Sequence, residues 1–120
     1  MGTKSFRSSG SVLADQSCRL FAYGTLRDPA VQQRLFGRGL EGDPDALSGY
    51  VPGTILIGGT TYPILHRGNA DDCVPGIALA MTAAELHAAD AYEGADYARI
   101  TVTLESGRRA FVYVSAGLGG

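Results

Sequence analysis

Short runs of strand-forming residues, each ended by glycine, proline or a polar turn, occupy most of the chain between residues 47 and 81. The runs are Leu47–Val51, Thr54–Ile57, Thr61–Leu65 and Val74–Met81. Runs of this length and composition, bounded by turn residues, predict strands. Because no helical signal separates them, they favour antiparallel neighbours over alternating βαβ units.

A first helix is predicted on the N-terminal side of this strand-rich region. A strand at Arg19–Tyr23 is followed by the loop Gly24–Arg27. Asp28 is then a suitable N-cap residue, and Pro29 suits the first helical position. We expect this helix to end near Gly37.

A second helix is predicted on the C-terminal side. Thr82 and Glu85 have the spacing of a capping box, and an alanine-rich segment follows. The helix should run to about Glu93, where Gly94 can end it in the left-handed conformation.

The remaining segment predicts a β-hairpin. Apolar and polar residues alternate from Ile100 to Glu105, and Ser106-Gly107 supplies a turn before the strand Ala110–Val114. The combined elements predict an α+β fold, with a small, mostly antiparallel sheet that is curled or barrel-like and two principal helices.

Length and composition predict one soluble domain. We place it at residues 19–116 of the 120, after a flexible N-terminal tail at residues 1–18 that has no apolar core of a secretory signal. We therefore expect a cytoplasmic protein. A net charge of −2 without a basic cluster argues against nucleic-acid or membrane partners, and no apolar run approaches the roughly 20 residues of a membrane span.

The two cysteines, Cys18 and Cys73, are expected to be reduced thiols in the cytosol, although a disulfide between them remains open. Neither has metal-ligand spacing with His66 or His87, so we expect no metal site.

Glu93 stands where the local field opposes its charge. The last turn of a helix carries partial negative charge, which favours cations over carboxylates. Leu86 is the one large aliphatic residue of this helix, and Asp90 and Glu93 share its face. If Leu86 faces the core, Glu93 points inward, and burial raises its pKa toward that of a general base. Two alternatives stay open: a solvated Glu93, or a Glu93 paired with Arg99, which would lower that pKa.

Tyr23-Gly24-Thr25-Leu26 forms a second candidate feature. A glycine directly after a strand lets backbone amides approach a ligand, and such amides can hold a carboxylate or an oxyanion. The same pattern also occurs in plain connections.

Taken in order, these motifs resemble the gamma-glutamylcyclotransferase family. The resemblance is carried by Tyr23-Gly24-Thr25-Leu26, Tyr62-Pro63, Val74-Pro75-Gly76, the segment from Ala89 to Arg99, and Phe111-Val112-Tyr113-Val114. It spans about Leu20 to Val114, and the compact subtype with a YGTL loop is most similar. Ala89 departs from the leucine usual in the family.

The resemblance implies an intramolecular acyl transfer. In such enzymes a γ-glutamyl group cyclises to 5-oxoproline and releases an amine or amino acid, without metal or organic cofactor. It implies that Glu93 is the catalytic base and acid, and that the substrate-binding residues are Tyr23, Gly24, Thr25, Leu26, Tyr62, Tyr97 and Tyr113. The identity of the leaving amine, the pathway and the oligomeric state stay open.

Two other functions are compatible with the sequence. One is a non-catalytic small-molecule binding module with the same fold. The other is an amide hydrolase, although neither cysteine lies in the motifs and neither histidine has a matching partner.

Overall fold

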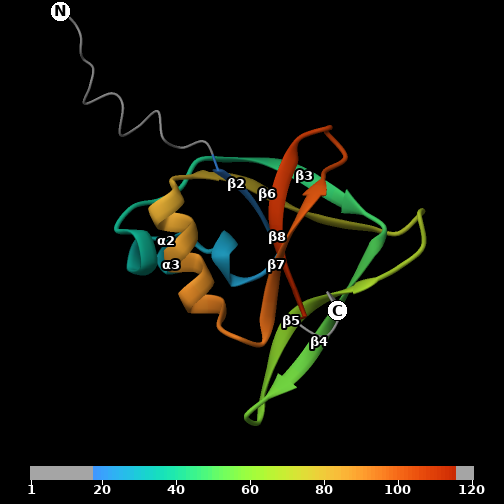
Figure 1. Ribbon diagram of the computed structural model, residues 1–120, viewed down its shortest axis with the longest axis horizontal. Coiled ribbons are helices and arrows are strands. Elements are labelled where there is room, and N and C mark those ends of the chain that lie inside the picture. Colours follow the sequence, from blue (N-terminus) through green and yellow to red (C-terminus); the bar gives the residue numbers. More distant parts are fainter. Residues whose placement is uncertain (1–17, 116–120) are drawn as a thin grey trace, which may run out of the picture.

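The structure is a computed structural model that describes residues 18–115 (Figure 1). Its elements, in chain order, are β2 (Cys18–Ala22), the 3₁₀ turn η1 (Thr25–Arg27), α2 (Pro29–Phe36), β3 (Gly42–Ser48), β4 (Tyr50–Ile57), β5 (Thr60–Arg67), β6 (Cys73–Met81), α3 (Ala83–Glu93), β7 (Tyr97–Thr103) and β8 (Arg109–Ser115). The expected N-terminal tail lies outside the described residues except for Cys18, which begins β2. Within residues 18–115, no helix has both the length and the apolar character needed to cross a membrane.

Five strands form one sheet in the order β3-β6-β2-β8-β7, and β4 and β5 form a separate two-stranded sheet. Every pair is antiparallel except β2 and β8, which run parallel. The prediction of an α+β fold with a mostly antiparallel sheet is confirmed, and β2 with β8 is the one parallel pair among the described strands. The direction of a pair so distant in sequence is set by the rest of the fold, because no hairpin connects its two strands.

Both helices lie together beside the five-stranded sheet (Figure 1). One core cluster joins them to it, with Leu20 of β2, Met81 of β6, Val31 of α2 and Leu86 of α3 all buried. Ala89, the departure from the family pattern, is fully buried in this cluster.

The predicted helix starts are confirmed. Asp28 accepts a hydrogen bond from the Ala30 amide, and both bonds of the Thr82–Glu85 capping box are present. At the end of α3, Gly94 has the positive φ that favours glycine, 80°, but its ψ of −173° lies outside the left-handed helical region that was expected.

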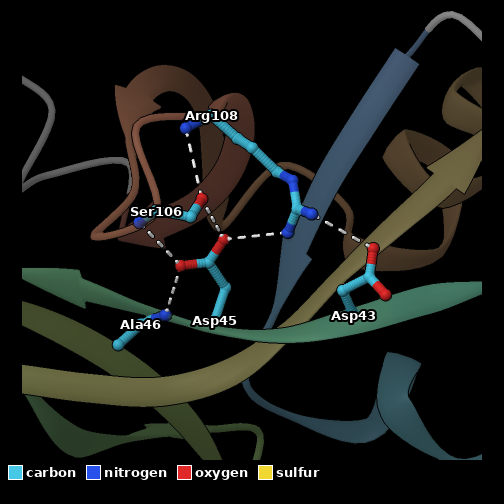
Figure 2. A network of polar contacts seen from close by, with 5 residues as sticks. All are labelled: Asp43, Asp45, Ala46, Ser106 and Arg108. Atoms are coloured by element: carbon cyan, nitrogen blue, oxygen red, sulfur yellow. Dashed lines mark hydrogen bonds and ion pairs between the residues drawn. The ribbon is translucent and has the colours of Figure 1, made fainter.

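The sheet curls until its two ends are joined. The Glu105 amide, in the turn that follows β7, donates to the Ala46 carbonyl of the edge strand β3 at 2.8 Å. Figure 2 shows the polar network beside this bond, in which Asp45 accepts hydrogen bonds from Ser106 and Arg108. Because these bonds tie β3 to the turn between β7 and β8, the barrel-like curl predicted from the sequence is present.

Two strand predictions need correction. Residues 37–45 were expected to be a Gly/Asp/Pro-rich connection, but residues 42–48 form β3, which pairs with β6 along its whole length. Pro52-Gly53 was expected to separate two strands but lies inside β4. Pro44 in β3 and Pro52 in β4 are tolerated because both strands lie at the edge of a sheet, where one row of backbone N–H groups is unpaired.

The two cysteines are free thiols, Cys18 half-buried and Cys73 exposed. Cys18 pairs with Met81 at one end of β6, whereas Cys73 begins the other end, about 25 Å away along the strand. A disulfide between them would therefore need the sheet to come apart.

Candidate active site

One cavity of about 390 Å³ brings together all eight residues selected from the sequence. Its described lining is Phe21, Ala22, Tyr23, Gly24, Thr25, Leu26, Tyr62, Pro63, Tyr92, Glu93, Asp96, Tyr97 and Tyr113. These residues come from the end of β2, the η1 turn, β5, the end of α3, the start of β7 and β8. A volume of this size is typical of a small-molecule site.

Glu93 reaches the cavity because it ends α3 on the face that Leu86 buries. Leu86 is 5% exposed, and Glu93 is half-buried one turn beyond Asp90. Burial raises the pKa of Glu93 to about 7, because little water is left to solvate the charged form.

Arg99 does not neutralise Glu93. Its guanidinium forms an ion pair with Asp90, with 3.0 Å between Nη1 and Oδ2, and lies 4.8 Å from the centre of the Phe111 ring. Within residues 18–115, Glu93 has no ion pair shorter than 4.0 Å. Arg99, which would have lowered the pKa of Glu93, is therefore paired with Asp90 instead.

The η1 turn forms the opposite wall. Its hydrogen bonds run from the Arg27 amide to the Gly24 carbonyl and from the Asp28 amide to the Thr25 carbonyl. The amides at the start of such a turn have no partner within it, so those of Thr25 and Leu26 can serve a ligand. A Cβ at Gly24 would lie 3.1 Å from Pro63 Cγ, so a side chain there would require β5 to shift by a few tenths of an ångström.

Gln32 of α2 holds this turn from behind. Its side chain is buried, donates to the Leu26 carbonyl at 2.8 Å and accepts from the Leu40 amide at 2.9 Å. Both ends of the side-chain amide are thus satisfied in the core, which fixes the position of Leu26.

Three tyrosine hydroxyls in the cavity wall donate to protein acceptors. Tyr23 donates to the Tyr113 carbonyl at 2.6 Å, Tyr113 donates to Asp90 Oδ1 at 2.7 Å, and Tyr97 donates to the Pro63 carbonyl at 2.9 Å. Burial is the main reason that the pKa of each of these tyrosines is raised, and the charge of Glu93 adds to the effect in all three. All three rings line the same cavity as Glu93.

Sequence reasoning missed three further contributors. Tyr92 and Asp96 line the cavity, and the Tyr92 hydroxyl is 2.8 Å from Thr25 Oγ1 across it. Both were in the quoted family segment, but nothing in the sequence says which of its side chains face inward. Nothing in the sequence predicted the role of Gln32, because polar residues are common on helices that lie at the surface.

No metal centre is found in the described part of the chain, where no three His, Cys, Asp or Glu side chains gather. The cavity itself offers two carboxylates, Glu93 and Asp96, together with tyrosine rings and backbone amides. This arrangement suits proton transfer to and from an organic substrate.

The family model described as "Gamma-glutamyl cyclotransferase, AIG2-like" matches residues 20–118. The chain is 31% identical over 87 residues to "Protein AIG2 C" of Arabidopsis thaliana, a match that covers 72% of this chain and 52% of that protein. The chain thus spans about half the length of that relative.

Solved structures share the fold. A solution structure of an Arabidopsis thaliana protein matches with a TM-score of 0.69 and 27% identity, over 86% of this chain and 64% of that one. A structure titled "Gamma-glutamyl cyclotransferase" matches with a TM-score of 0.70 and 17% identity, over 82% of this chain and 66% of that one.

Proposed function

The chain belongs to the Gamma-glutamyl cyclotransferase, AIG2-like family, and from this premise we propose that it releases 5-oxoproline from a γ-glutamyl amine or γ-glutamyl amino acid. One observation carries the proposal. The half-buried Glu93 opens into the same cavity as the Gly24–Leu26 turn, and burial raises its pKa to about 7. A carboxylate in that range can accept a proton and return it near neutral pH.

In the proposed reaction, Glu93 first takes a proton from the substrate's α-ammonium group. The freed α-amine attacks the γ-carbonyl carbon of the same residue, so a carbon–nitrogen bond closes the five-membered ring and the carbonyl oxygen becomes an oxyanion. As the carbonyl re-forms, the bond to the leaving nitrogen breaks, and that nitrogen takes the proton from Glu93. The ring nitrogen still carries a second proton of the former α-ammonium group; the regenerated Glu93 carboxylate accepts it and passes it to the released amine, which leaves as an ammonium ion. The products are 5-oxoproline and the amine, and no water or cofactor is consumed.

The turn and the tyrosines take the remaining roles. The amides of Gly24, Thr25 and Leu26 would hold the α-carboxylate or the oxyanion, where the loss of one donor typically costs about 3 kcal/mol of barrier. Tyr23 and Tyr113 would line the glutamyl pocket. Tyr62 of β5 and Tyr97 at the start of β7 would line its other side, where the Tyr97 hydroxyl donates to the Pro63 carbonyl. Because the attack occurs within one molecule, folding the substrate toward the ring geometry supplies much of the acceleration.

The test is a product assay. The protein and its Glu93→Gln variant are incubated with γ-glutamyl amines and dipeptides in water enriched in oxygen-18, and 5-oxoproline and glutamate are measured by mass spectrometry. Release of 5-oxoproline by the wild type alone supports the proposal. Labelled glutamate without a cyclic product would identify a hydrolase, and binding without any product would identify a binding module.

A further inference from the structure

Arg99 projects from the same face of the sheet as Tyr113. The two residues are directly opposite each other in the antiparallel pair of β7 and β8, and opposite residues of such a pair share a face. Tyr113 lines the cavity, whereas Arg99 is not among the described lining residues. The sheet therefore places a guanidinium group beside the cavity wall without putting it into the cavity.

Asp90 of α3 binds both of these side chains. Its Oδ1 accepts the hydrogen bond from the Tyr113 hydroxyl at 2.7 Å, and its Oδ2 lies 3.0 Å from Arg99 Nη1. The guanidinium also lies 4.8 Å from the centre of the Phe111 ring. The side chains of Arg99 and Asp90 are 30% and 36% exposed, and an ion pair that is this open to water contributes little to stability. Its effect on where the guanidinium lies is therefore of more consequence than its effect on stability.

Glu93 is the next carboxylate on this side of α3. Residues three apart on a helix have Cβ atoms about 5–6 Å apart, so an arginine bound to Asp90 needs to move by only about that distance to meet Glu93. A positive charge within about 4–6 Å favours the ionised form of a carboxylate and lowers its pKa by about 1–3 units. An arginine paired with Glu93 would therefore make it a weaker base.

The other groups around Glu93 supply no positive charge to the cavity. The titratable residues that line the cavity with it are Tyr23 of β2, Tyr62 of β5, Tyr92 of α3, Asp96, Tyr97 of β7 and Tyr113 of β8. On η1, Arg27 directs its Nε–H to the Gly24 carbonyl at 3.3 Å. Arg38, which follows α2, pairs with Glu85 at the far end of α3. Of these cations, Arg99 is the one that the fold places one helical turn from Glu93.

We propose that Asp90 is a positioning residue for the proposed reaction: it holds Arg99 away from Glu93, which leaves Glu93 free to take up and return a proton. The inference rests on the function proposed above and adds to it the residue that keeps the base available. When position 90 carries no charge, Arg99 turns to Glu93, and the carboxylate then stays ionised where the reaction needs it to hold a proton.

A substitution and its suppressor test the inference. The proteins compared are the wild type, Asp90→Asn, the double variant Asp90→Asn/Arg99→Gln, and the control Asp71→Asn, an exposed carboxylate outside the cavity. Asparagine at position 90 keeps an oxygen that can accept from Tyr113, so the charge is removed and the hydrogen bond is kept. The titration of Glu93 is followed by carbon-13 NMR of its carboxyl carbon, assigned by its absence in E93Q. The pH dependence of kcat/KM for 5-oxoproline release is measured on the same proteins.

The midpoint of the Glu93 titration should be about 7 in the wild type and about one pH unit lower in D90N. The apparent pKa of kcat/KM should move with it, and the plateau of kcat/KM should fall about threefold, because a weaker base transfers protons less effectively. Removal of Arg99 as well should return all three values close to those of the wild type, and D71N should leave them unchanged. Damage to the structure alone would not be repaired by a second substitution.

An unchanged midpoint in D90N would overturn the inference, and so would a midpoint in the double variant as low as that in D90N. Thermal unfolding shows whether D90N is folded. If it is not, Asp90→Ser, which is uncharged and smaller, is judged by the same criteria with and without Arg99→Gln.

The NMR titration does not depend on turnover, so the two proposals can fail separately. Midpoints that move as expected without release of 5-oxoproline by the wild type would refute only the reaction. Release of 5-oxoproline with the same Glu93 midpoint in every protein would refute only the role of Asp90.

Discussion

The Tyr113 hydroxyl donates to Asp90 Oδ1 at 2.7 Å and so joins the last turn of α3 to the interior strand β8. Asp90 also takes the ion pair with Arg99, at 3.0 Å. Asp90 and Glu93, three residues apart on one helix, therefore have different surroundings. Asp90 is held by polar partners, while Glu93 is left to the cavity with its pKa raised.

We predict that Glu93→Gln lowers the rate of 5-oxoproline release at least about 100-fold, because the amide can neither accept nor return the proton. The thermal midpoint of the variant should match or exceed that of the wild type at pH 8, where the wild type carries a half-buried charge. Glu105→Gln, an exposed change of the same kind, is the control. Turnover that survives in E93Q would assign the proton transfer to another group.

The pH dependence follows from the raised pKa of Glu93, about 7 against an ordinary value of 4.5. The base must be ionised, so kcat/KM should rise with an apparent pKa near 7 as pH increases. Between about pH 4.5 and 7 the unfolded state loses this proton while the native state keeps it, so the contribution of Glu93 to stability falls as pH rises. Thermal midpoints of the wild type relative to E93Q should therefore decline from pH 4 to pH 8. A constant difference would contradict the raised pKa.

A double-mutant cycle should detect the bond between Tyr113 and Asp90. Tyr113 is 5% exposed, so Asp90→Ala leaves its hydroxyl without an acceptor and should lower the free energy of unfolding by about 1–3 kcal/mol. Urea denaturation of Asp90→Ala, Tyr113→Phe and the double variant should give a coupling of about 1 kcal/mol. Strictly additive effects would show that the bond contributes nothing.

The contribution of Asp45 to the free energy of unfolding should depend on whether its carboxyl group is ionised. Burial alone would raise its pKa, but hydrogen bonds from Ser106 and Ala46 and the charge of Arg108 outweigh burial and lower it. Its stabilisation is thus present above the unfolded-state value of 3.8 and is lost as pH falls through the lower native value.

Asp45→Asn should accordingly cost about 2 kcal/mol at pH 7, judged from hydrogen bonds to a charged group, and clearly less near pH 2. Denaturant titrations at both values measure the difference. Asp43→Asn is the matched control, because the Asp43 side chain is 70% exposed while that of Asp45 is 2% exposed. Equal losses of stability in the two variants would mean that the hydrogen bonds around Asp45 do not stabilise the fold.

Gln32→Met should remove both hydrogen bonds of this side chain, which leaves the Leu26 carbonyl of the η1 turn and the Leu40 amide without these partners. We expect a loss of about 1–3 kcal/mol in stability. If the turn binds the substrate, KM should also rise more than kcat falls. The neighbouring Gln33→Met, on the exposed side of α2, controls for the change of residue type. A stable variant with unchanged KM would show that the turn holds its shape without Gln32.

Local signals in the sequence predicted the local structure well. Asp28 with Pro29, and Thr82 with Glu85, mark helix starts through contacts within a few residues, and both are confirmed. Strand β3 could not be predicted in the same way, because Gly42-Asp43-Pro44-Asp45 has little strand propensity and becomes a strand through its ladder with β6.

The site was predictable to the extent that its residues neighbour one another along the chain. The inward direction of Glu93 follows from its spacing to Leu86, and the structure places both as expected. Which residue Arg99 binds depends on where β7 runs relative to α3. No spacing rule could decide between Asp90 and Glu93, and the fold alone assigns that partner.

The parallel pairing of β2 with β8 has a consequence for biosynthesis. Tyr23 and the Tyr113 carbonyl that accepts its hydrogen bond are separated by 90 positions, so the ribosome must translate nearly the whole domain before these two walls of the cavity can meet. A nascent chain halted before β8 exposes one edge of β2, and such an intermediate is a natural substrate for chaperones.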